Sequence, residues 1–302
     1  MTLTSRLRRL GVLALMLAVL GVAVPNSGNA ATQAVLVEYR KAEGVAVSDD
    51  DVVWILGVGS DARPGEEMTR VRGDALQLVG MNTETGAATS IGIPRDSYVT
   101  IPGYGSDRIN AAMTYGGPQL LGDTVAELVG IAPDYIFVTR FPFFEDMVDD
   151  IGGITVDNPR EFDDVNLKDD GFPAGKVKLN GYSAMAFSRI RKTLIGGDFD
   201  RSANQQLVLR GIQKRIRAQH GTSGFIEKGV LTVMEHTDTD LSPAQLFRIA
   251  HAIAQVRPSR ITGCVVQGGI ADIGGASVVT PDTAAAQRYG DEARTTAVIE
   301  EC

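Results

Sequence analysis

Charged residues gather where apolar, strand-like runs of this 302-residue sequence begin or end. The first run ends in "GSDAR", the second begins with "RVRGD" and the third ends in "PRD". If the second run pairs with the first in the opposite direction, these ends meet on one rim of a sheet, and ligands of α/β proteins often bind at strand ends. The side chains that would converge there are Asp61, Arg63, Arg72, Asp74 and Arg95.

Two carboxylates and three guanidinium groups on one rim indicate a site for phosphate and a metal ion. Magnesium commonly takes one or two carboxylates together with substrate phosphates, and arginine forks onto two phosphate oxygens. The alternative is a solvated turn, in which an exposed pair such as Arg95–Asp96 contributes only about 0–1 kcal/mol. The tripeptide "RGD" also matches an adhesion motif, but it opens an apolar strand here instead of an exposed loop tip.

A second charged cluster, "RIRKTLIGGDFDRSANQ", begins at Arg189. Extended backbone would place Arg189 and Arg191 on one face, with the isoleucine between them buried behind. Arg201 and Gln205 are four residues apart and share a face at the positive N-terminus of a long amphipathic helix, with Asp198 beside them. A helix N-terminus that carries arginine is a good anion site. The alternative is a solvated, positively charged helix face.

Strands alternate with helices along the chain, which predicts a layered α/β domain. The turn "TETG" joins two of the apolar runs as a hairpin. Such runs predict strands over 52–58, 74–82, 87–94, 134–141, 154–159 and 260–268. Apolar residues at helical spacing predict helices over 117–130, 142–153, 180–187, 201–219, 225–236 and 242–256.

The N-terminus differs in character from the rest of the chain. Residues 1–30 join an arginine cluster to an uncharged apolar run and a small-residue segment, so we expect a secretory signal peptide. A retained membrane anchor is the alternative, although the run is shorter than the roughly 20 residues that a spanning helix needs. In both cases the remainder is extracytoplasmic. The formal net charge of −8 disfavours nucleic acid as a partner.

We expect one domain after the export segment. A polar lead-in over 31–51 precedes a catalytic core over 52–219, and the helices and late strand of 220–302 are expected to pack on the same domain. Cys264 and Cys302 are the two cysteines of the sequence. In an exported protein they can pair and tie down the C-terminus, but spacing alone leaves the pairing open.

Longer stretches of the chain carry a family resemblance. The chain contains, in this order, "GSDAR", "RGDALQLVGMNTETGAATSIGIPRDSYVTIPGYG", "RINAAMTYGGPQLLGDTVAELVGIAPDYIFVTRF", "DIGGITVDNP", "LNGYSAMAFSRIRK" and "GDFDRSANQQ". On these stretches, roughly residues 53 to 217, it resembles the LytR–CpsA–Psr family of cell-envelope proteins. Residues 218–302 carry little resemblance.

The resemblance implies an α/β fold, a three-layer α/β/α sandwich with a central mixed β-sheet. It implies a Mg²⁺-dependent phosphotransferase that moves a glycopolymer from a polyprenyl-pyrophosphate carrier onto peptidoglycan at the outer face of the membrane, with the polyprenyl tail in an apolar groove. By motif position, Asp61 and Asp74 resemble the magnesium ligands, and Arg95 and Asp198 the catalytic residues, with Asp198 as a possible base. The residues that resemble the pyrophosphate cradle are Arg63, Arg72, Arg95, Arg189, Arg191, Arg201 and Gln205.

Two other functions remain open at this point. One is a lipid-pyrophosphate hydrolase or binding protein without transfer, and the more remote one is a transcriptional regulator, against which export and acidic charge argue. The sequence also departs from the family at two positions: Gly73 stands where the family often has Ser, and Asn204 where it often has Arg. The second change removes a cationic donor, which would weaken phosphate binding or change the preferred ligand.

Overall fold

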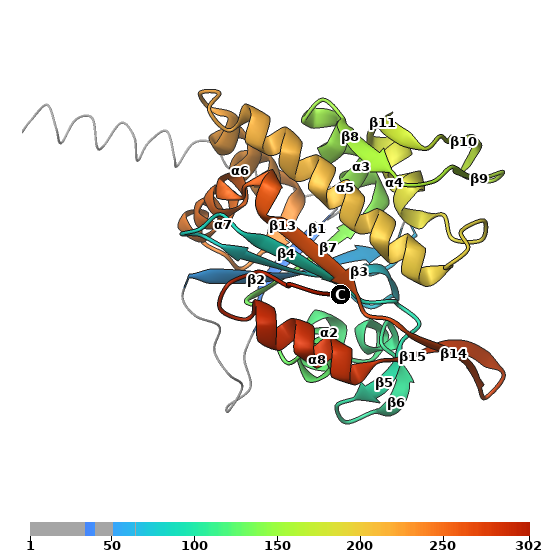
Figure 1. The fold of residues 1–302 in the computed structure, drawn as a ribbon. Helices are drawn as coiled ribbons and strands as arrows, with labels where there is room; N and C mark the ends of the chain where they lie inside the picture. Colours follow the sequence, from blue (N-terminus) through green and yellow to red (C-terminus); the bar gives the residue numbers. More distant parts are fainter. Residues whose placement is uncertain (1–33, 40–50, 64) are drawn as a thin grey trace, which may run out of the picture. The chain divides into compact units, whose positions relative to one another are not determined.

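The computed structural model describes residues 34–39, 51–63 and 65–302, so the expected signal peptide or anchor over 1–30 lies outside the described residues. A seven-stranded mixed sheet has the order β12-β1-β7-β2-β3-β4-β13 (Figure 1). Its strands are β1 (Ala34–Glu38), β2 (Val52–Ser60), β3 (Gly73–Asn82), β4 (Ala88–Gly92), β7 (Tyr135–Arg140), β12 (Thr237–Thr239) and β13 (Ile261–Val265). Strand β2 pairs antiparallel with β3, which is the arrangement that would bring the charged strand ends together, and it pairs parallel with β7.

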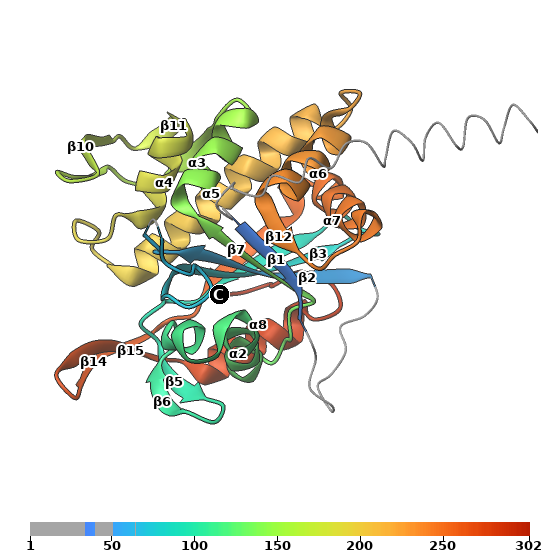
Figure 2. The same cartoon turned by 180° about the vertical axis from the view of Figure 1, so that it is seen from behind.

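Helices cover both faces of the sheet, which confirms the predicted α/β/α sandwich (Figures 1 and 2). One side carries α3 (Phe141–Asp150), α4 (Gly181–Arg189), α5 (Asp198–Gln219), α6 (Phe225–His236) and α7 (Pro243–Gln255). The other side carries α2 (Ala111–Val129) and α8 (Thr283–Ala293). Among the residues that the structure describes, no helix combines the length and the apolar character needed to cross a membrane.

Within the described residues, four two-stranded ribbons accompany the main sheet. They pair β5 (Tyr98–Ile101) with β6 (Gly105–Arg108), β8 (Ile154–Asn158) with β11 (Gly175–Leu179), β9 (Phe162–Asp164) with β10 (Lys168–Phe172), and β14 (Gly268–Ile273) with β15 (Ala276–Pro281). A second core beneath α3, α4 and α5 contains the mutually packed rings of Phe162, Phe172 and Phe187. A disulfide joins Cys264 of β13 to Cys302, the last residue.

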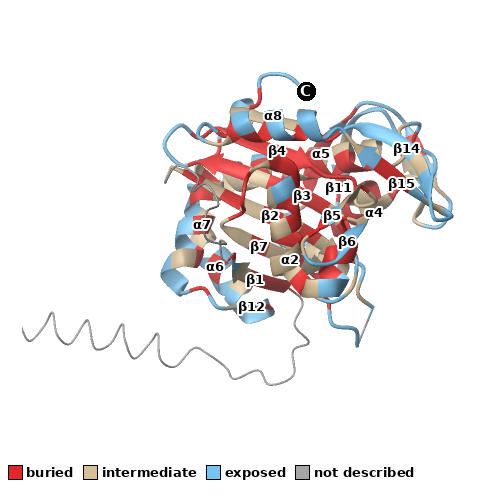
Figure 3. Cartoon of the chain, turned by 90° about the horizontal axis from the view of Figure 1, so that it is seen from below, coloured by how far each residue is buried: buried red, intermediate tan, exposed pale blue. Residues whose placement is uncertain are grey.

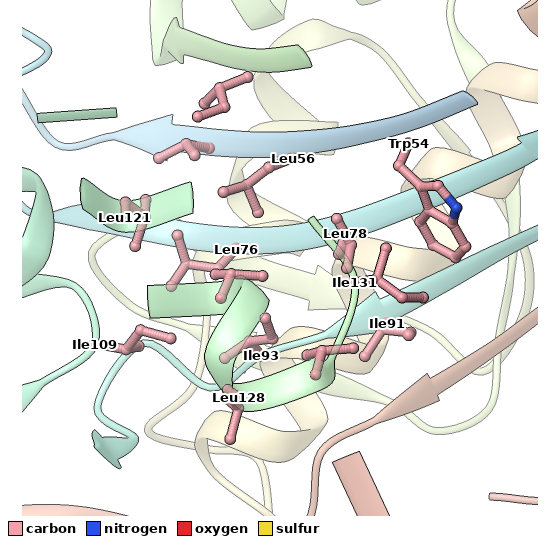
Figure 4. Close-up of a cluster of buried hydrophobic side chains, with 14 of the residues drawn as sticks. Trp54, Leu56, Leu76, Leu78, Ile91, Ile93, Ile109, Leu121, Leu128 and Ile131 are labelled. Atoms are coloured by element: carbon pink, nitrogen blue, oxygen red, sulfur yellow. The ribbon is translucent and has the colours of Figure 1, made fainter. Parts of the chain in front are cut away.

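The side of the sheet beneath α2 and α8 is fully packed, and we call it the filled face. It contains Trp54 and Leu56 of β2, Leu76 and Leu78 of β3, and Leu121 of α2, all with no exposed surface (Figure 4). Because the side chains of a strand alternate between faces, every second residue of β2 lies in this layer.

The opposite side of the same strands is only partly covered, and we call it the open face. Its half-buried apolar side chains are Val53, Ile55, Val79, Tyr135 and Phe137, and Ile253 of α7 belongs to the same apolar clusters. Figure 3 shows intermediate residues along β2 and β7 beside the buried ones. Although its sequence is a nearly continuous apolar run, β2 is therefore fully buried on one face only, because α6 and α7 cover the other face incompletely.

Two other sequence expectations also need correction. Ordered structure does not begin near residue 51, because the apolar stretch "AVLVE" inside the expected lead-in forms β1 and pairs with β7 and β12. Helix α2 begins at Ala111, before the expected start, and breaks at Gly117, whose φ of 73° is left-handed. Pro118 starts the second part of the helix, where its fixed φ is tolerated.

Candidate active site

The first charged cluster forms at the β2–β3 end of the sheet. Antiparallel pairing brings the end of β2 next to the start of β3, and the backbone N–H of Asp61 donates to the carbonyl of Arg72 at 3.4 Å. Asp74 is buried there and accepts a hydrogen bond from Arg95, which follows β4. Three strand ends therefore supply this part of the site, as the sequence predicts.

The second cluster meets the first through Arg189, at the C-terminus of α4. Its Nη2 lies 3.2 Å from Asp61 Oδ1 and 3.4 Å from Asp74 Oδ2. The same guanidinium lies over the ring of Phe141, 4.1 Å from the ring centroid. A ring face attracts a cation, so Phe141 holds Arg189 between the two aspartates.

Asp96 joins three arginines from different parts of the chain. It lies 3.4 Å from Arg191 Nη1 and 3.8 Å from both Arg95 Nε and Arg108 Nη1. Its carbonyl accepts from Val279 N–H at 2.9 Å, which fixes the backbone of the "PRD" turn against β15. The Arg95–Asp96 pair at this strand end is thus part of a network and not a solvated turn.

Asp198 connects the network to helix α5. Its Oδ1 accepts from Arg191 at 3.2 Å and its Oδ2 from Arg201 at 3.0 Å. Burial lowers the pKa of Arg201 to about 10, which Asp198 opposes and the nearby charges of Arg95 and Arg191 reinforce. Buried Arg201 thus has two further arginines near it, an arrangement that is suited to an anion.

Taken together, the contacts form one continuous network of five arginines and four aspartates. Its members are Asp61, Asp74, Arg95, Asp96, Arg108, Arg189, Arg191, Asp198 and Arg201. The Nε of Arg95 is buried with no hydrogen-bond partner in the part of the chain that the structure describes. A buried N–H group that lacks a hydrogen bond, in a network with more arginines than aspartates, is suited to a phosphate oxygen.

Three of the predicted residues lie elsewhere than in this network. Arg63 and Arg72 are exposed on the segments that flank it. Gln205 is buried beneath it, where its Oε1 accepts from Gln77 at 3.1 Å and its Nε2 donates to the carbonyl of Ser188 at 3.2 Å. The structure thus places Gln205 in the support of α4 and α5 against β3.

The two departures from the family also have structural settings. A Cβ at Gly73 would lie 2.9 Å from Val58 Cγ1 and 3.3 Å from Leu76 Cδ2, so a larger residue would displace core side chains. Asn204 is 5% exposed, and its Nδ2 has no hydrogen-bond partner among the described residues. The cation that the family often carries is therefore replaced here by a buried neutral amide.

Sequence reasoning missed three residues that shape the site. Arg108 is the last residue of β6, and its pairing with Tyr98 of β5, two residues after "PRD", brings it to Asp96. Arg140 donates to the carbonyls of Ala62 and Arg63 at 3.1 and 3.0 Å, and so holds the loop after β2. Phe141 supports Arg189. Arg140 is the last residue of β7 and Phe141 follows it, and only the parallel register with β2 brings them here.

The donor set of the rim fits a magnesium ion. Asp61 and Asp74 both reach one nitrogen of Arg189, so the two carboxylates face a shared cation position. Among the described residues, no group of three or more His, Cys, Asp or Glu side chains gathers to hold a metal. At such a site Asp61 and Asp74 would supply two carboxylates, and substrate phosphates and water would supply the remaining oxygen ligands, as is common for Mg²⁺.

Solved structures share this fold. Bacillus subtilis TagU is 26% identical, with a TM-score of 0.61, and the match covers 84% of this chain and 99% of that one. A structure of TagT bound to LI-WTA is 25% identical, with a TM-score of 0.63, over 80% of this chain and 89% of the other.

Sequence relatives lead to the same group. The polyisoprenyl-teichoic acid–peptidoglycan teichoic acid transferase TagU of Bacillus cereus is 33% identical over 207 residues. That match spans 68% of this chain and 65% of TagU, so the chain covers less than two thirds of the length of this relative. The model of the LytR_cpsA_psr family matches residues 20–295, which includes the C-terminal part where sequence reading alone found little resemblance. The chain belongs to the LytR–CpsA–Psr family.

Proposed function

We propose that this protein is an extracytoplasmic phosphotransferase that moves a glycopolymer from a polyprenyl-pyrophosphate carrier onto peptidoglycan. The observation that carries the proposal is the single network of arginines and aspartates at the strand ends, in which the buried Nε of Arg95 has no hydrogen-bond partner among the described residues. The activity named for the relative TagU, a transfer of teichoic acid from a polyisoprenyl carrier to peptidoglycan, supports it.

The network is suited to a pyrophosphate group. Its five arginines outnumber its four aspartates, and exposed Arg63 and Arg72 add positive charge at its edge. Each hydrogen bond between a guanidinium and a phosphate oxygen contributes about 1.5–3 kcal/mol. The aspartates fix the arginines in place before the substrate arrives, which lowers the cost of ordering them on binding.

The open face provides the surface for the lipid tail. Its half-buried side chains include Ile55 and Phe137, which come from strands that lead to the charged network. A polyprenyl chain over these residues would remove apolar surface from water, worth roughly 25 cal/mol per Å². The pyrophosphate would then lie at the strand ends.

The reaction is an in-line displacement at phosphorus. A peptidoglycan hydroxyl oxygen attacks the phosphorus nearest the sugar, a new O–P bond forms, and the bond from that phosphorus to the bridging oxygen breaks. Polyprenyl phosphate leaves with the bridging oxygen and its electron pair. The arginines neutralise the charge that gathers on the phosphoryl oxygens. Held by Asp61 and Asp74, Mg²⁺ would supply further charge neutralisation to the same oxygens.

The hydroxyl proton needs an acceptor, and Asp198 is our candidate. Both of its oxygens are engaged by arginines, so it would exchange one of these contacts to take the proton. The contacts also give Asp198 a positioning role toward Arg191 and Arg201. Asp198→Asn would separate the roles, because a base requires the carboxylate and shows it in the pH profile of turnover.

The proposal is tested with a lipid-linked glycan that carries a labelled sugar. The label should move to peptidoglycan with the parent protein in Mg²⁺, and Arg95→Ala should lose at least about 100-fold in rate, as expected when a charge-stabilising donor is removed. Arg288→Ala removes an exposed arginine of α8 and should leave the rate unchanged. Release of polyprenyl phosphate without transfer of label would instead identify a hydrolase.

A further inference from the structure

Two exposed tyrosines form an aromatic platform beside the charged network. Tyr104 lies at the tip of the β5–β6 hairpin and Tyr115 on α2, and they are 57% and 40% exposed. Their rings are stacked, with centroids 5.1 Å apart and planes inclined by 10°. Gly103 and Gly105 flank Tyr104 with φ of 78°, so the tight left-handed turn needs glycine on both sides and carries the ring outward.

The platform is fixed by hydrogen bonding. The hydroxyl of Tyr115 donates to Asp107 Oδ2 at 2.6 Å, and this bond lowers the pKa of Asp107 and raises the pKa of Tyr115. The charge of Arg72 acts on both groups and lowers the pKa of each, so Arg72 lies within electrostatic reach of the platform. An exposed ring that is held in place loses little side-chain freedom when a ligand binds.

One strand connects the platform to the charged network. Asp107 and Arg108 are neighbours on β6, and neighbouring strand residues point to opposite faces. Asp107 bonds Tyr115, whereas Arg108 lies 3.8 Å from Asp96 of the network. The platform and the network are therefore anchored by adjacent residues of the same short strand.

The chemistry of the platform suits a pyranose ring. The face of an aromatic ring is electronegative, so it attracts the C–H groups on the apolar face of a sugar. Asp107 and the exposed Arg72 offer an acceptor and donors for sugar hydroxyls. Exposed aromatic side chains with polar groups around them are typical of a binding surface.

The side of the sheet on which the platform lies indicates that it binds the acceptor and not the donor. Strands β5 and β6 lie with α2 and α8, opposite α5, α6 and α7 (Figures 1 and 2). The open face, where the polyprenyl chain is proposed to lie, is on the α6 and α7 side. In an in-line displacement the attacking and leaving oxygens lie on opposite sides of phosphorus. A leaving polyprenyl phosphate on one side therefore requires the acceptor on the other.

We infer that the platform of Tyr104 and Tyr115 docks the glycan strand of the peptidoglycan acceptor, so that a sugar hydroxyl reaches the phosphorus held by the network. The inference rests on the proposed function for the direction of attack. The binding of the glycan itself can be measured without any turnover.

The test uses peptide-free glycan strands released from peptidoglycan, titrated into the full protein without a donor. Tyr104→Ala should weaken their binding roughly five- to tenfold, because it removes an aromatic contact. Tyr104→Phe keeps the ring and should bind within about twofold of the parent. Tyr182→Ala, at a tyrosine of α4 that is 46% exposed, is the matched control and should bind as the parent does. The affinity for the lipid-linked donor should be unchanged in all three.

Three results would overturn the inference. The first is that the parent protein does not bind the glycan strands. The second is that Tyr104→Ala binds them as tightly as the parent does. The third is that Tyr104→Ala weakens donor binding instead, which would assign the rings to the donor glycan. Release of polyprenyl phosphate into water by the parent is measured in parallel. A lack of transfer of labelled glycan to intact peptidoglycan by the parent would count against the proposed function, and release into water alone would identify a hydrolase, whereas the glycan titration still reports on the platform.

Discussion

The two faces of the central sheet are made by neighbouring residues of the same strands, yet they differ in packing. On β2, Leu56 has no exposed surface on the filled face, whereas the adjacent Ile55 is half-buried on the open face. The filled face is closed by α2, α8 and the C-terminal tail, including Ala297 and Ile299. On the open face, α6 and α7 leave apolar side chains partly uncovered.

The filled face of the sheet therefore contributes stability, and the open face is available to bind a ligand. Interiors are packed to high density, and a face that is filled in this way has no room for a ligand. An apolar face that keeps solvent contact, beside a charged network, can accept a ligand with a hydrophobic tail and an anionic head. The same alternation of residues thus supplies a core and a binding surface.

The largest effect on stability is expected at Leu56. Leu56→Ala should lower the free energy of unfolding by about 2–5 kcal/mol, because it removes buried contacts and leaves a cavity. Urea unfolding of the parent and the variant measures the difference. A loss well below this range would show that the filled face can collapse around the cavity, and the contrast between the faces would weaken.

The second-largest effect on stability is expected from removal of the disulfide. Cys264 and Cys302 close a 38-residue separation and pin the C-terminal tail to the filled face. Cys302→Ser should reduce stability by about 2–4 kcal/mol, mainly because the unfolded chain gains freedom. Thermal unfolding with and without reductant measures it. Equal melting of the oxidised parent and the variant would mean that the tail is held by its apolar contacts alone.

Ile55→Ala is the matched change on the open face, since it removes the same number of carbon atoms as Leu56→Ala. We expect it to cost only about 1 kcal/mol of stability, because the side chain already contacts solvent. It should instead weaken the binding of a polyprenyl donor several-fold. A destabilisation as large as that of Leu56→Ala would contradict the distinction between the two faces.

The smallest effect concerns pH. Burial, opposed by Asp198, lowers the pKa of Arg201 to about 10, so the free protein loses this charge as the pH rises through that value. A bound anion favours the protonated form, so binding of inorganic pyrophosphate should take up a proton and weaken above about pH 10. Calorimetry on the parent and on Arg201→Gln measures the step. The same pH dependence in both proteins would assign it to another group.

Local patterns in the sequence predicted much of this architecture. The periodicity of apolar residues predicted strands that alternate with helices. The predicted antiparallel pairing of the first two strands also placed Asp61 and Asp74 together, as the structure has them. The interpretation of Arg189 and Arg191 is confirmed in geometry, because α4 ends at Arg189 and Ile190 is buried behind them. These features depend on residues that are close in sequence.

The remaining features depend on tertiary contacts that no local pattern contains. Strand β1 is only five residues long and needs β7 and β12 as partners. Arg140 reaches the loop after β2 only through the parallel register of β7. Gln205 shares a helix face with Arg201 but lies one turn further along α5, where that face packs against β3, so helical spacing alone could not separate a ligand contact from a buried support.

The most direct test of the account is a calorimetric series with inorganic pyrophosphate, geranyl pyrophosphate and farnesyl pyrophosphate. For the parent protein in Mg²⁺, the affinity should rise with chain length, because each buried methylene contributes about 0.8 kcal/mol. Arg95→Ala should weaken all three ligands by a similar factor. Ile55→Ala should leave inorganic pyrophosphate unaffected and reduce the gain with chain length. An affinity in the parent that is independent of chain length, or an unchanged series in Arg95→Ala, would contradict the joint use of the open face and the charged network.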